Sequence, residues 1–402
     1  MQPRIYLPSE HTIDPQLIDR EAIVVINKLK SAGYSAYLVG GSVRDLLAKK
    51  VPKDFDISTS ARPEEIKSLF GRQCILIGRR FRLAHIRFGH KILEVSTFRA
   101  GDPAEGALIT QDNQWGTEEE DVLRRDFTIN GLYYDPNDQK VIDYVGGWED
   151  INNRLLRTIG DPIVRFKQDP VRMIRLIKFR ARLRYDIVSD TKIALLKCLP
   201  EILKSSPARV LEEMYKMLES GASAPFFQLM ADSGLLNLLF PKINPYFENP
   251  DSEAYGFLIA SDQINQKDLK RPLSRSTLTA AVLFPLIDQA LKEKKNSGNV
   301  PHLGQIHSIC YELIHQNLIS AFSHFPRRIL SEAAMMITHQ YRMTPLQGKM
   351  HFSPRFLRSR DFADALLLLR IRAEANEELM DVFEEWRKHY QHLKKEGHHS
   401  KK

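Results

Sequence analysis

The chain has 402 residues, of which 43% are hydrophobic and 27% charged, a balance that can bury a substantial core and excludes a largely disordered protein. At ordinary domain sizes this length predicts about two or three domains. Lysine and arginine outnumber aspartate and glutamate by 58 to 50, so the charge favours a polyanionic partner such as nucleic acid only weakly.

The three cysteines and the apolar runs bear on the setting of the protein. Cys74, Cys198 and Cys310 are far apart, odd in number and without metal-ligand spacing, which predicts a reduced, cytoplasmic protein with no zinc site. The first residues contain no apolar core of the signal-peptide type. The longest apolar runs, such as residues 365–369, are too short to span a bilayer, so no membrane segment is expected.

The chain changes character near residue 150. From about residue 36 to 150, short β-branched apolar runs alternate with helical stretches such as residues 63–70, a pattern typical of an α/β fold. Residues 140–160 contain a glycine pair and several turn-formers. From Asp161 onwards nearly every long segment has helical periodicity, so this part is predicted to be all-α.

A glycine pair follows the first buried strand of this α/β part. Residues 37–39 are expected to form the strand, Gly40 and Gly41 a tight turn, and the following residues a helix that Ser42 could cap. A helix that starts in this way presents backbone N–H groups to an anion, and Arg44 adds a positive charge. The pattern is consistent with a phosphate site, although most glycine pairs mark only a turn.

Two aspartates lie a short distance further along the chain. On a strand, Asp54 and Asp56 would project from the same face, whereas Phe55 and Ile57 would point into the core. Paired carboxylates suit Mg²⁺ or Mn²⁺, which bind oxygen ligands and substrate phosphates. The alternative is an acidic strand end that faces water.

A third carboxylate lies on another predicted strand. Glu94 stands between apolar residues in residues 91–99, where its charge needs a partner or a place at the same metal site. The alternative is a partly exposed strand position, paired with Arg99.

Residues 118–134 contain a second polar group. On a helix, Arg125, Ile129 and Leu132 would share one side, and Asp126 and Asn130 would stand one turn apart and cooperate. Taken alone, Asp126 and Asn130 could equally be an ordinary i, i+4 pair.

Residues 166–183 are predicted to form an amphipathic helix with an arginine in one of its apolar stripes. Arg172 lies in the stripe made by Leu176, Phe179 and Leu183, and Asp169 stands three residues before it, as either a functional pair or a structural salt bridge. A separate basic face could meet phosphates or water; it consists of Arg175, Lys178 and Arg182.

Four of these motifs occur in an order that resembles a known family. The set GGSVRD (40–45), DFD (54–56), EVSTFR (94–99) and RRDFTIN (124–130) resembles the class II branch of the nucleotidyltransferase superfamily. That branch holds the bacterial poly(A) polymerases and the CCA-adding tRNA nucleotidyltransferases, and the likeness runs from about residue 30 to 220.

The resemblance implies an α/β nucleotidyltransferase head with a polymerase-β-like mixed sheet, followed by an all-α neck and body. The expected divisions are a catalytic head at 1–150, a nucleotide- and RNA-binding neck at 151–220, an RNA-binding body at 221–390 and a basic tail at 391–402.

The resemblance also implies roles for individual residues. Asp54, Asp56 and Glu94 would bind metal and act in catalysis, together with Asp126 as a further active-site carboxylate. Asp169 and Arg172 would read the base, although this chain has Gln168 where the family has glutamate. The remaining residues expected to contact the nucleotide are Gly40, Gly41, Ser42, Arg44, Arg125 and Asn130.

Residues 76–88 distinguish the two activities of this family. CCA-adding enzymes usually carry a Gly-Thr pair after a histidine here, whereas this chain has the Gly-Arg-Arg-Phe-x-Leu-x-His form that resembles the bacterial poly(A) polymerases. Arg79, Arg80 and Arg82 are therefore expected to bind RNA or the triphosphate, unless they form an ordinary basic surface loop.

We therefore expect a template-independent enzyme that adds AMP from ATP to RNA 3′ ends, with Mg²⁺ or Mn²⁺ as cofactor and no role for DNA. CCA addition to tRNA is the first alternative. A non-catalytic RNA-binding protein is the second; the neutral Gln168 favours it, and the clustered carboxylates argue against it.

Overall fold

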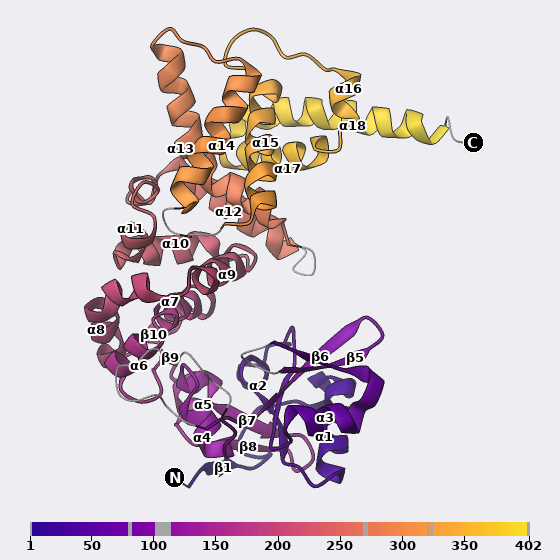
Figure 1. The fold of residues 1–402 in the computed structure, drawn as a ribbon, viewed down its shortest axis with the longest axis vertical. Coiled ribbons are helices and arrows are strands. Elements are labelled where there is room, and N and C mark those ends of the chain that lie inside the picture. The colour runs from indigo at the N-terminus through magenta and orange to yellow at the C-terminus, as the bar shows by residue number, and fades with distance from the viewer. Residues whose placement is uncertain are drawn as a thin grey trace. The chain divides into compact units, whose positions relative to one another are not determined.

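The computed structural model describes residues 2–78, 83–100, 114–267, 272–319, 322 and 325–399, with side chains up to residue 394. The chain divides into two compact units, Met1–Ile202 and Leu203–Lys402, which are described in turn (Figure 1). The expected three-part division into head, neck and body stays a prediction. In the part of the chain that the structure describes, no helix has the length and apolar character needed to cross a membrane. All three cysteines are free and buried.

The first unit is built on an eight-stranded mixed sheet, as the α/β pattern predicted. The strands run in the order β1-β8-β7-β2-β3-β6-β5-β4. Within it, β3 and β6 pair in parallel and every other neighbouring pair is antiparallel. The strands are β1 (Arg4–Tyr6), β2 (Ala36–Val39), β3 (Asp56–Thr59), β4 (Cys74–Ile77), β5 (Leu83–Phe88), β6 (Lys91–Thr97), β7 (Leu132–Asp135) and β8 (Lys140–Asp143).

Two helices cover one face of this sheet. α1 (Arg20–Ser31) packs on β2 and β3, and α3 (Pro63–Phe70) packs on β4 and β5 (Figure 1). Strand side chains alternate between the two faces of a sheet. The buried Ile57 and Val95 point to the face that these helices cover, so their neighbours along each strand point to the other face. The carboxylates predicted to act in catalysis therefore lie on the opposite face.

The helix after the glycine pair starts differently from the prediction. α2 (Gly41–Leu47) has Gly40 at its N-cap, in a backbone conformation with φ 68° that glycine adopts without strain. Ser42 does not cap the helix, because it is already in its first turn and its hydroxyl donates to the carbonyl oxygen of Val39 at 2.9 Å.

The segment that carries the RRDFTIN motif is not one helix. α4 (Glu118–Leu123) ends before the motif, residues 128–130 form a single 3-10 turn, and Leu132 opens β7. The backbone of Phe127 forms an isolated antiparallel bridge with Thr158, and Thr128 and Ile129 are β-branched, which disfavours a helix. The predicted helical face of Arg125, Ile129 and Leu132 is therefore wrong.

The rest of the first unit is mostly helical. Pro170 separates α6 (Pro162–Gln168) from α7 (Val171–Leu183), so the helix predicted over 166–183 is two helices. β9 (Leu155–Leu156) and β10 (Asp186–Ile187) form a short parallel pair inside this region. The other helices are α5 (Gly147–Asn152) and α8 (Ser189–Cys198).

The described part of the second unit contains helices and no strand, which confirms the all-α prediction for this part. Its helices are α9 (Pro207–Leu218), α10 (Ser223–Asp232), α11 (Leu235–Leu239), α12 (Glu253–Lys267), α13 (Arg275–Asn296), α14 (Leu303–Ile319), α15 (Arg327–Met343), α16 (Pro354–Leu357), α17 (Phe362–Ala375) and α18 (Met380–His399).

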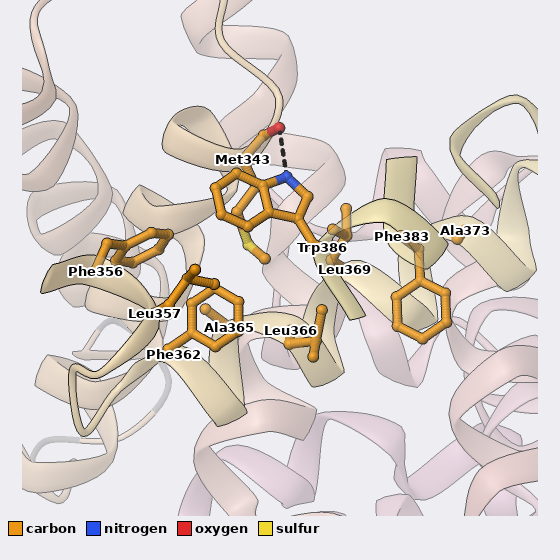
Figure 2. Packing of buried hydrophobic residues seen from close by; sticks show 10 residues of the cluster. All are labelled: Met343, Phe356, Leu357, Phe362, Ala365, Leu366, Leu369, Ala373, Phe383 and Trp386. Carbon is orange, nitrogen blue, oxygen red and sulfur yellow. Dashed lines mark hydrogen bonds between the residues drawn. The ribbon is translucent and has the colours of Figure 1, made fainter. Parts of the chain in front are cut away.

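An aromatic cluster joins the last helices of this unit. The indole ring of Trp386 is fully buried between Phe356 and Phe362, and its Nε1 donates to the carbonyl oxygen of Met343 at 3.2 Å (Figure 2). The cluster thereby holds α18 against α16 and α17, and the buried tryptophan supplies much of the apolar contact.

Candidate active site

Two carboxylates and two hydroxyls form a ladder on the open face of the sheet. In the parallel pairing of β3 with β6, Asp56 lies opposite Glu94 and Ser58 lies opposite Ser96. The two serine Oγ atoms are 2.8 Å apart. The pairing of these strands, which are distant in sequence, therefore brings together the carboxylates that the sequence placed on separate strands.

These carboxylates form one wall of a pocket of about 450 Å³ in the first unit. Arginines from three other segments line it as well, so negative and positive side chains meet across the same space. A pocket of this size holds a small ligand. The lining residues are Val39, Asp56, Ile57, Leu83, Glu94, Ser96, Arg99, Asp121, Arg124, Arg125 and Arg175.

Asp56 is a carboxylate of the pocket whose pKa is clearly raised. Its side chain is solvent-accessible but enclosed by the pocket walls, and this partial desolvation, followed by the charge of Glu94, raises its pKa to about 6. Glu94 also faces His85, whose Nε2 lies 3.4 Å from Glu94 Oε1. Two carboxylates that oppose one another in this way favour a cation between them.

Asp54 lies just before β3, exposed and close enough for its charge to raise the pKa of Asp56 further. It does not line the pocket. Within the described ranges, no group of three or more His, Cys, Asp and Glu side chains is close enough to hold a metal ion by itself. Asp56 and Glu94 are therefore the pair that the fold brings together, with Asp54 beside them.

Arg125 is held in the pocket by several partners. Its Nη2 donates to Asp121 Oδ2 at 2.9 Å and to Ser58 Oγ at 3.2 Å, and its guanidinium lies 5.4 Å from the ring centre of Tyr133. Burial alone would lower the pKa of Arg125, but Asp121 and Tyr133 raise it above its ordinary value. Arg125 therefore keeps its charge and a fixed position beside the serine pair.

Asp126 and Asn130 cooperate, although no helix joins them. Asn130 Nδ2 donates to Asp126 Oδ1 at 3.1 Å, and Arg175 Nη2 lies 2.9 Å from Asp126 Oδ2. Burial acts to raise the pKa of Asp126, but Arg175 and the bond from Asn130 lower it below the usual value. On its other side, Asn130 accepts a hydrogen bond from Arg44 Nη1 at 2.8 Å. This chain of contacts ties the glycine turn to α7.

The glycine turn lies next to Arg125. A side-chain carbon built on Gly40 would approach Arg125 Nη1 at 3.6 Å, so the turn and the guanidinium are in contact range. Arg44 is buried, and its Nε and Nη2 both donate to Asp45 Oδ1. Arg125 Nη1 also donates to the backbone carbonyl oxygen of Asn130 at 3.4 Å, so the positive charges of Arg44 and Arg125 both lie beside this residue.

Asp169 and Arg172 form the buried pair at the junction of α6 and α7. Arg172 Nε lies 4.0 Å from Asp169 Oδ2, and its Nη2 donates to the carbonyl oxygen of Arg124 at 2.7 Å. Its Nη1 is buried and has no hydrogen-bond partner among the described residues. Burial, followed by the nearby Arg165, lowers the pKa of Arg172 to about 10. Gln168 accepts a hydrogen bond from Arg165 Nη1 at 3.2 Å.

The three residues of α7 that are predicted to contact RNA differ in their exposure to solvent. Arg175 faces the pocket, Lys178 is buried with its Nζ 5.4 Å from the ring centre of Phe179, and Arg182 is exposed. The predicted contacts at Arg79, Arg80 and Arg82 lie outside the described residues.

Sequence reasoning missed three charged residues of the pocket. Asp121 stands four residues before Arg125 and makes the i, i+4 ion pair that the spacing allows, so this signal was present in the sequence. Arg99 and Arg124 line the same pocket, but only the fold places the end of β6 beside the end of α4.

Comparisons with known proteins show the family of the chain. A family model described as "Poly A polymerase head domain" matches residues 36–157, and one described as "Probable RNA and SrmB- binding site of polymerase A" matches residues 184–247. Poly(A) polymerase I of Escherichia coli O6:H1 is 36% identical over 399 residues, which cover 94% of this chain and 83% of the relative. The chain belongs to the bacterial poly(A) polymerase and CCA-adding enzyme family.

Members of both branches of this family of nucleotidyltransferases are similar to the chain. The CCA-adding enzyme of Streptococcus gordonii is 38% identical over 216 residues, or 52% of this chain and 51% of that enzyme. The crystal structure of the Bacillus stearothermophilus CCA-adding enzyme in complex with CTP superposes with a TM-score of 0.65 and 25% identity. The superposition covers 92% of this chain and 82% of that one, which confirms the expected nucleotidyltransferase head followed by helices.

Proposed function

We propose that the protein is a template-independent polynucleotide adenylyltransferase, which transfers AMP from ATP to the 3′ ends of RNA and releases pyrophosphate. The observation that carries the proposal is the pocket itself, in which Asp56 and Glu94 face Arg99, Arg124 and Arg125. Nucleotidyl transfer needs both kinds of charged group, because the negative carboxylates act at the reacting oxygens and the positive arginines bind the triphosphate.

The carboxylates fit a divalent cation. Asp56 and Glu94 offer only oxygen atoms, and the pKa of Asp56 is raised first by desolvation and then by the charge of Glu94, which a cation would offset. We propose that these two residues and Asp54 hold two Mg²⁺ ions, or Mn²⁺ in their place. When bound, such ions would activate the RNA 3′-hydroxyl and offset the charge of the leaving pyrophosphate.

Residues of the chain itself would position the triphosphate. Within the proposal, Arg125 contacts the phosphates from the position that Asp121 and Ser58 give it, beside the Gly40 turn. Asn130 is fixed between Arg44 and Asp126 and is proposed to contact the ribose. The fixed positions favour rapid reaction, because little conformational entropy has to be lost when the substrate binds.

Base choice is proposed to rest on Asp169 and Arg172. The buried, unpartnered Nη1 of Arg172 needs an acceptor, which an incoming base edge would supply. The neutral Gln168 contacts Arg165, so Asp169 is the carboxylate that orients Arg172.

Poly(A) addition is favoured over CCA addition by the extent of the likeness. The poly(A) polymerase relative matches 94% of the chain, and the similarly identical CCA-adding relative matches 52%. CCA addition remains the second candidate, because the B. stearothermophilus structure was solved with CTP and has the same fold. Both candidates use the same pocket and differ in base and acceptor.

Single-nucleotide incorporation separates the two candidates. Purified protein with Mg²⁺ is incubated with ATP or CTP alone, on an unstructured RNA and on a tRNA that lacks its terminal CCA. The proposal predicts extension of both RNAs with ATP and little with CTP. Addition of C to the tRNA from CTP alone, with no addition of A from ATP alone and no extension of the unstructured RNA, would establish CCA addition instead.

A further inference from the structure

The sheet face that carries the carboxylates continues across two more strands. Glu94 on β6 lies opposite His85 on β5, and His85 lies opposite Ile75 on β4. Directly opposed residues of neighbouring strands project from the same face. Asp56, Glu94, His85 and Ile75 therefore form one row across β3, β6, β5 and β4, with the catalytic carboxylates at one end and an isoleucine at the other.

The β4 end of this face is apolar and open. Ile75 is 36% exposed and Ile77 is 44% exposed, and Leu83, which is opposite Ile77, lines the catalytic pocket. We call Ile75, Ile77 and Leu83 the isoleucine platform. On the other face of the same strands, Cys74, Ala84 and Ile86 are buried, and α3 packs against β4 and β5. The three side chains are thus neighbours on one face, and they extend from the pocket lining at Leu83 to the edge strand β4.

The charges around the pocket indicate which molecule lies on the isoleucine platform. If the proposed function holds, the arginines at the α4 side of the pocket hold the triphosphate, so the acceptor has to approach Asp56 and Glu94 from the β5 side. No residue of β4 or β5 is acidic, and Arg87 is exposed on the platform's face. With strands about 4.8 Å apart, the platform lies within about 15 Å of Asp56, a reach of a few nucleotides.

We infer that the isoleucine platform binds the bases of the last nucleotides of the RNA acceptor, and so directs the 3′-hydroxyl towards Asp56 and Glu94. This inference rests on the proposed function. Isoleucine and leucine bury a base face but make no hydrogen bond with its edge, so the platform accepts any sequence. That property suits an enzyme without a template, because the RNA ends that it extends differ in sequence.

The first test replaces the two exposed isoleucines. Threonine keeps the β-branched shape that suits a strand, so the double variant Ile75→Thr/Ile77→Thr should fold normally. The KM for a short unstructured RNA should rise about five- to tenfold, as expected for lost apolar contact, while the KM for ATP stays the same. The matched control is Ile5→Thr, a 50% exposed isoleucine on β1 at the opposite edge of the sheet, which should change neither value.

The second test removes the base instead of the side chain. RNA primers that carry one abasic residue at successive positions near the 3′ end are extended by the wild type and by the double variant. In the wild type, an abasic residue over the platform should raise the KM for RNA by a similar factor. In the double variant, the same abasic residue should not raise the KM for RNA any further, because the substitutions and the missing base remove the same contact.

Three outcomes separate the inference from its alternatives. An unchanged KM for RNA in the double variant, or full additivity with the abasic residue, overturns the platform and leaves the proposed function standing. A change from dimer to monomer in light scattering, with the KM for RNA unchanged, would assign the surface to a second copy of the chain. Failure of the wild type to extend any RNA would overturn the proposed function, and the inference with it.

Discussion

At the scale of single residues, the proposed nucleotidyl transfer depends most on the carboxylate of Asp56. Replacing Asp56 with asparagine keeps the shape of the side chain but removes a proposed cation ligand. We predict that Asp56→Asn lowers kcat by at least about a hundredfold, since even the loss of a supporting residue around a metal costs up to that much.

The control for this variant is Asp138→Asn, which removes an exposed aspartate that pairs with Lys140 on the surface. Its kcat should equal that of the wild type. Equal activity of the wild type and Asp56→Asn would show that catalysis takes place elsewhere.

In the proposed site, Asp121 would act on the nucleotide through Arg125. It accepts hydrogen bonds from Arg125 Nη2, from the hydroxyl of Tyr133 at 2.8 Å and from the backbone N–H of Arg99 at 3.2 Å. Without this charge, Arg125 loses its ion-pair partner in the pocket. Asp121→Asn should therefore raise the KM for ATP by about tenfold, a typical effect of one hydrogen bond to a charged group, and should change the KM for RNA less.

The two Michaelis constants measured side by side decide this role. A rise in both constants in proportion to a lower melting temperature would mean that Asp121 is needed only for stability.

At the scale of elements, the start of α5 supports the turn that holds Asn130. Asp143 Oδ1 accepts from the N–H groups of Gly146 and Gly147, and Asp150 accepts from the hydroxyl of Thr128 at 2.7 Å. A Cβ on Gly147 would lie 2.2 Å from the carbonyl oxygen of Thr128, so this glycine permits the close approach.

We predict that Gly147→Ala displaces the 3-10 turn at 128–130 and reduces ATP affinity, at a stability cost of about 1–3 kcal/mol. Gly146→Ala is the matched control. Gly146 has φ +76° and open space around its Cβ position, so alanine there should cost about 1 kcal/mol without moving the turn. Isothermal titration with ATP compares the two folded variants, and equal affinities would contradict the supporting role of α5.

A histidine of α15 should make the second unit sensitive to acid. Burial lowers the pKa of His339, and Arg342 and His307 lower it further, although Asp361 acts to raise it. Above the ordinary histidine pKa, the His339 side chain is neutral in both the folded and the unfolded state, so the folded state keeps its full stability. As the pH falls below about 6.5, the unfolded state binds the proton first, and stability is lost until the pH passes the lower folded pKa.

The check is urea unfolding of the full chain at about pH 8 and about pH 5.5, for the wild type and for His339→Gln. The variant should lose less stability on acidification than the wild type. An identical loss in both proteins would show that His339 does not titrate between these values.

At the scale of the whole molecule, regular patterns predicted the architecture well. The α/β and all-α parts follow from period-2 and helical patterns, and the strands expected at residues 37–39, at Asp56 and within 91–99 are present. The errors in the predicted helices and strands are local, and they arise where contacts between distant residues change the local structure. Phe127 pairs with Thr158 and ends a predicted helix, and a two-residue strand forms at Asp186 because Leu155 is beside it.

The candidate site was also predicted only in part, because some of its residues come together through contacts between distant segments. Motif order and spacing identified Asp56 and Glu94, whose shared rung follows from the parallel pairing of β3 and β6. Spacing along the chain could not reveal that Arg99 and Arg124 line the same pocket, or that Lys178 is buried, because these facts depend on how distant segments pack.

The central claim is adenylyl transfer to RNA 3′ ends in the pocket of Asp56 and Glu94, and one measurement tests it most directly. Labelled ATP is supplied as the only nucleotide, with Mg²⁺ and an unstructured RNA primer, and the products are separated by length. We predict a ladder of products extended by many AMP residues with the wild type, and no ladder with Asp56→Asn. The absence of extension by the wild type, or an equal ladder from Asp56→Asn, would contradict the claim.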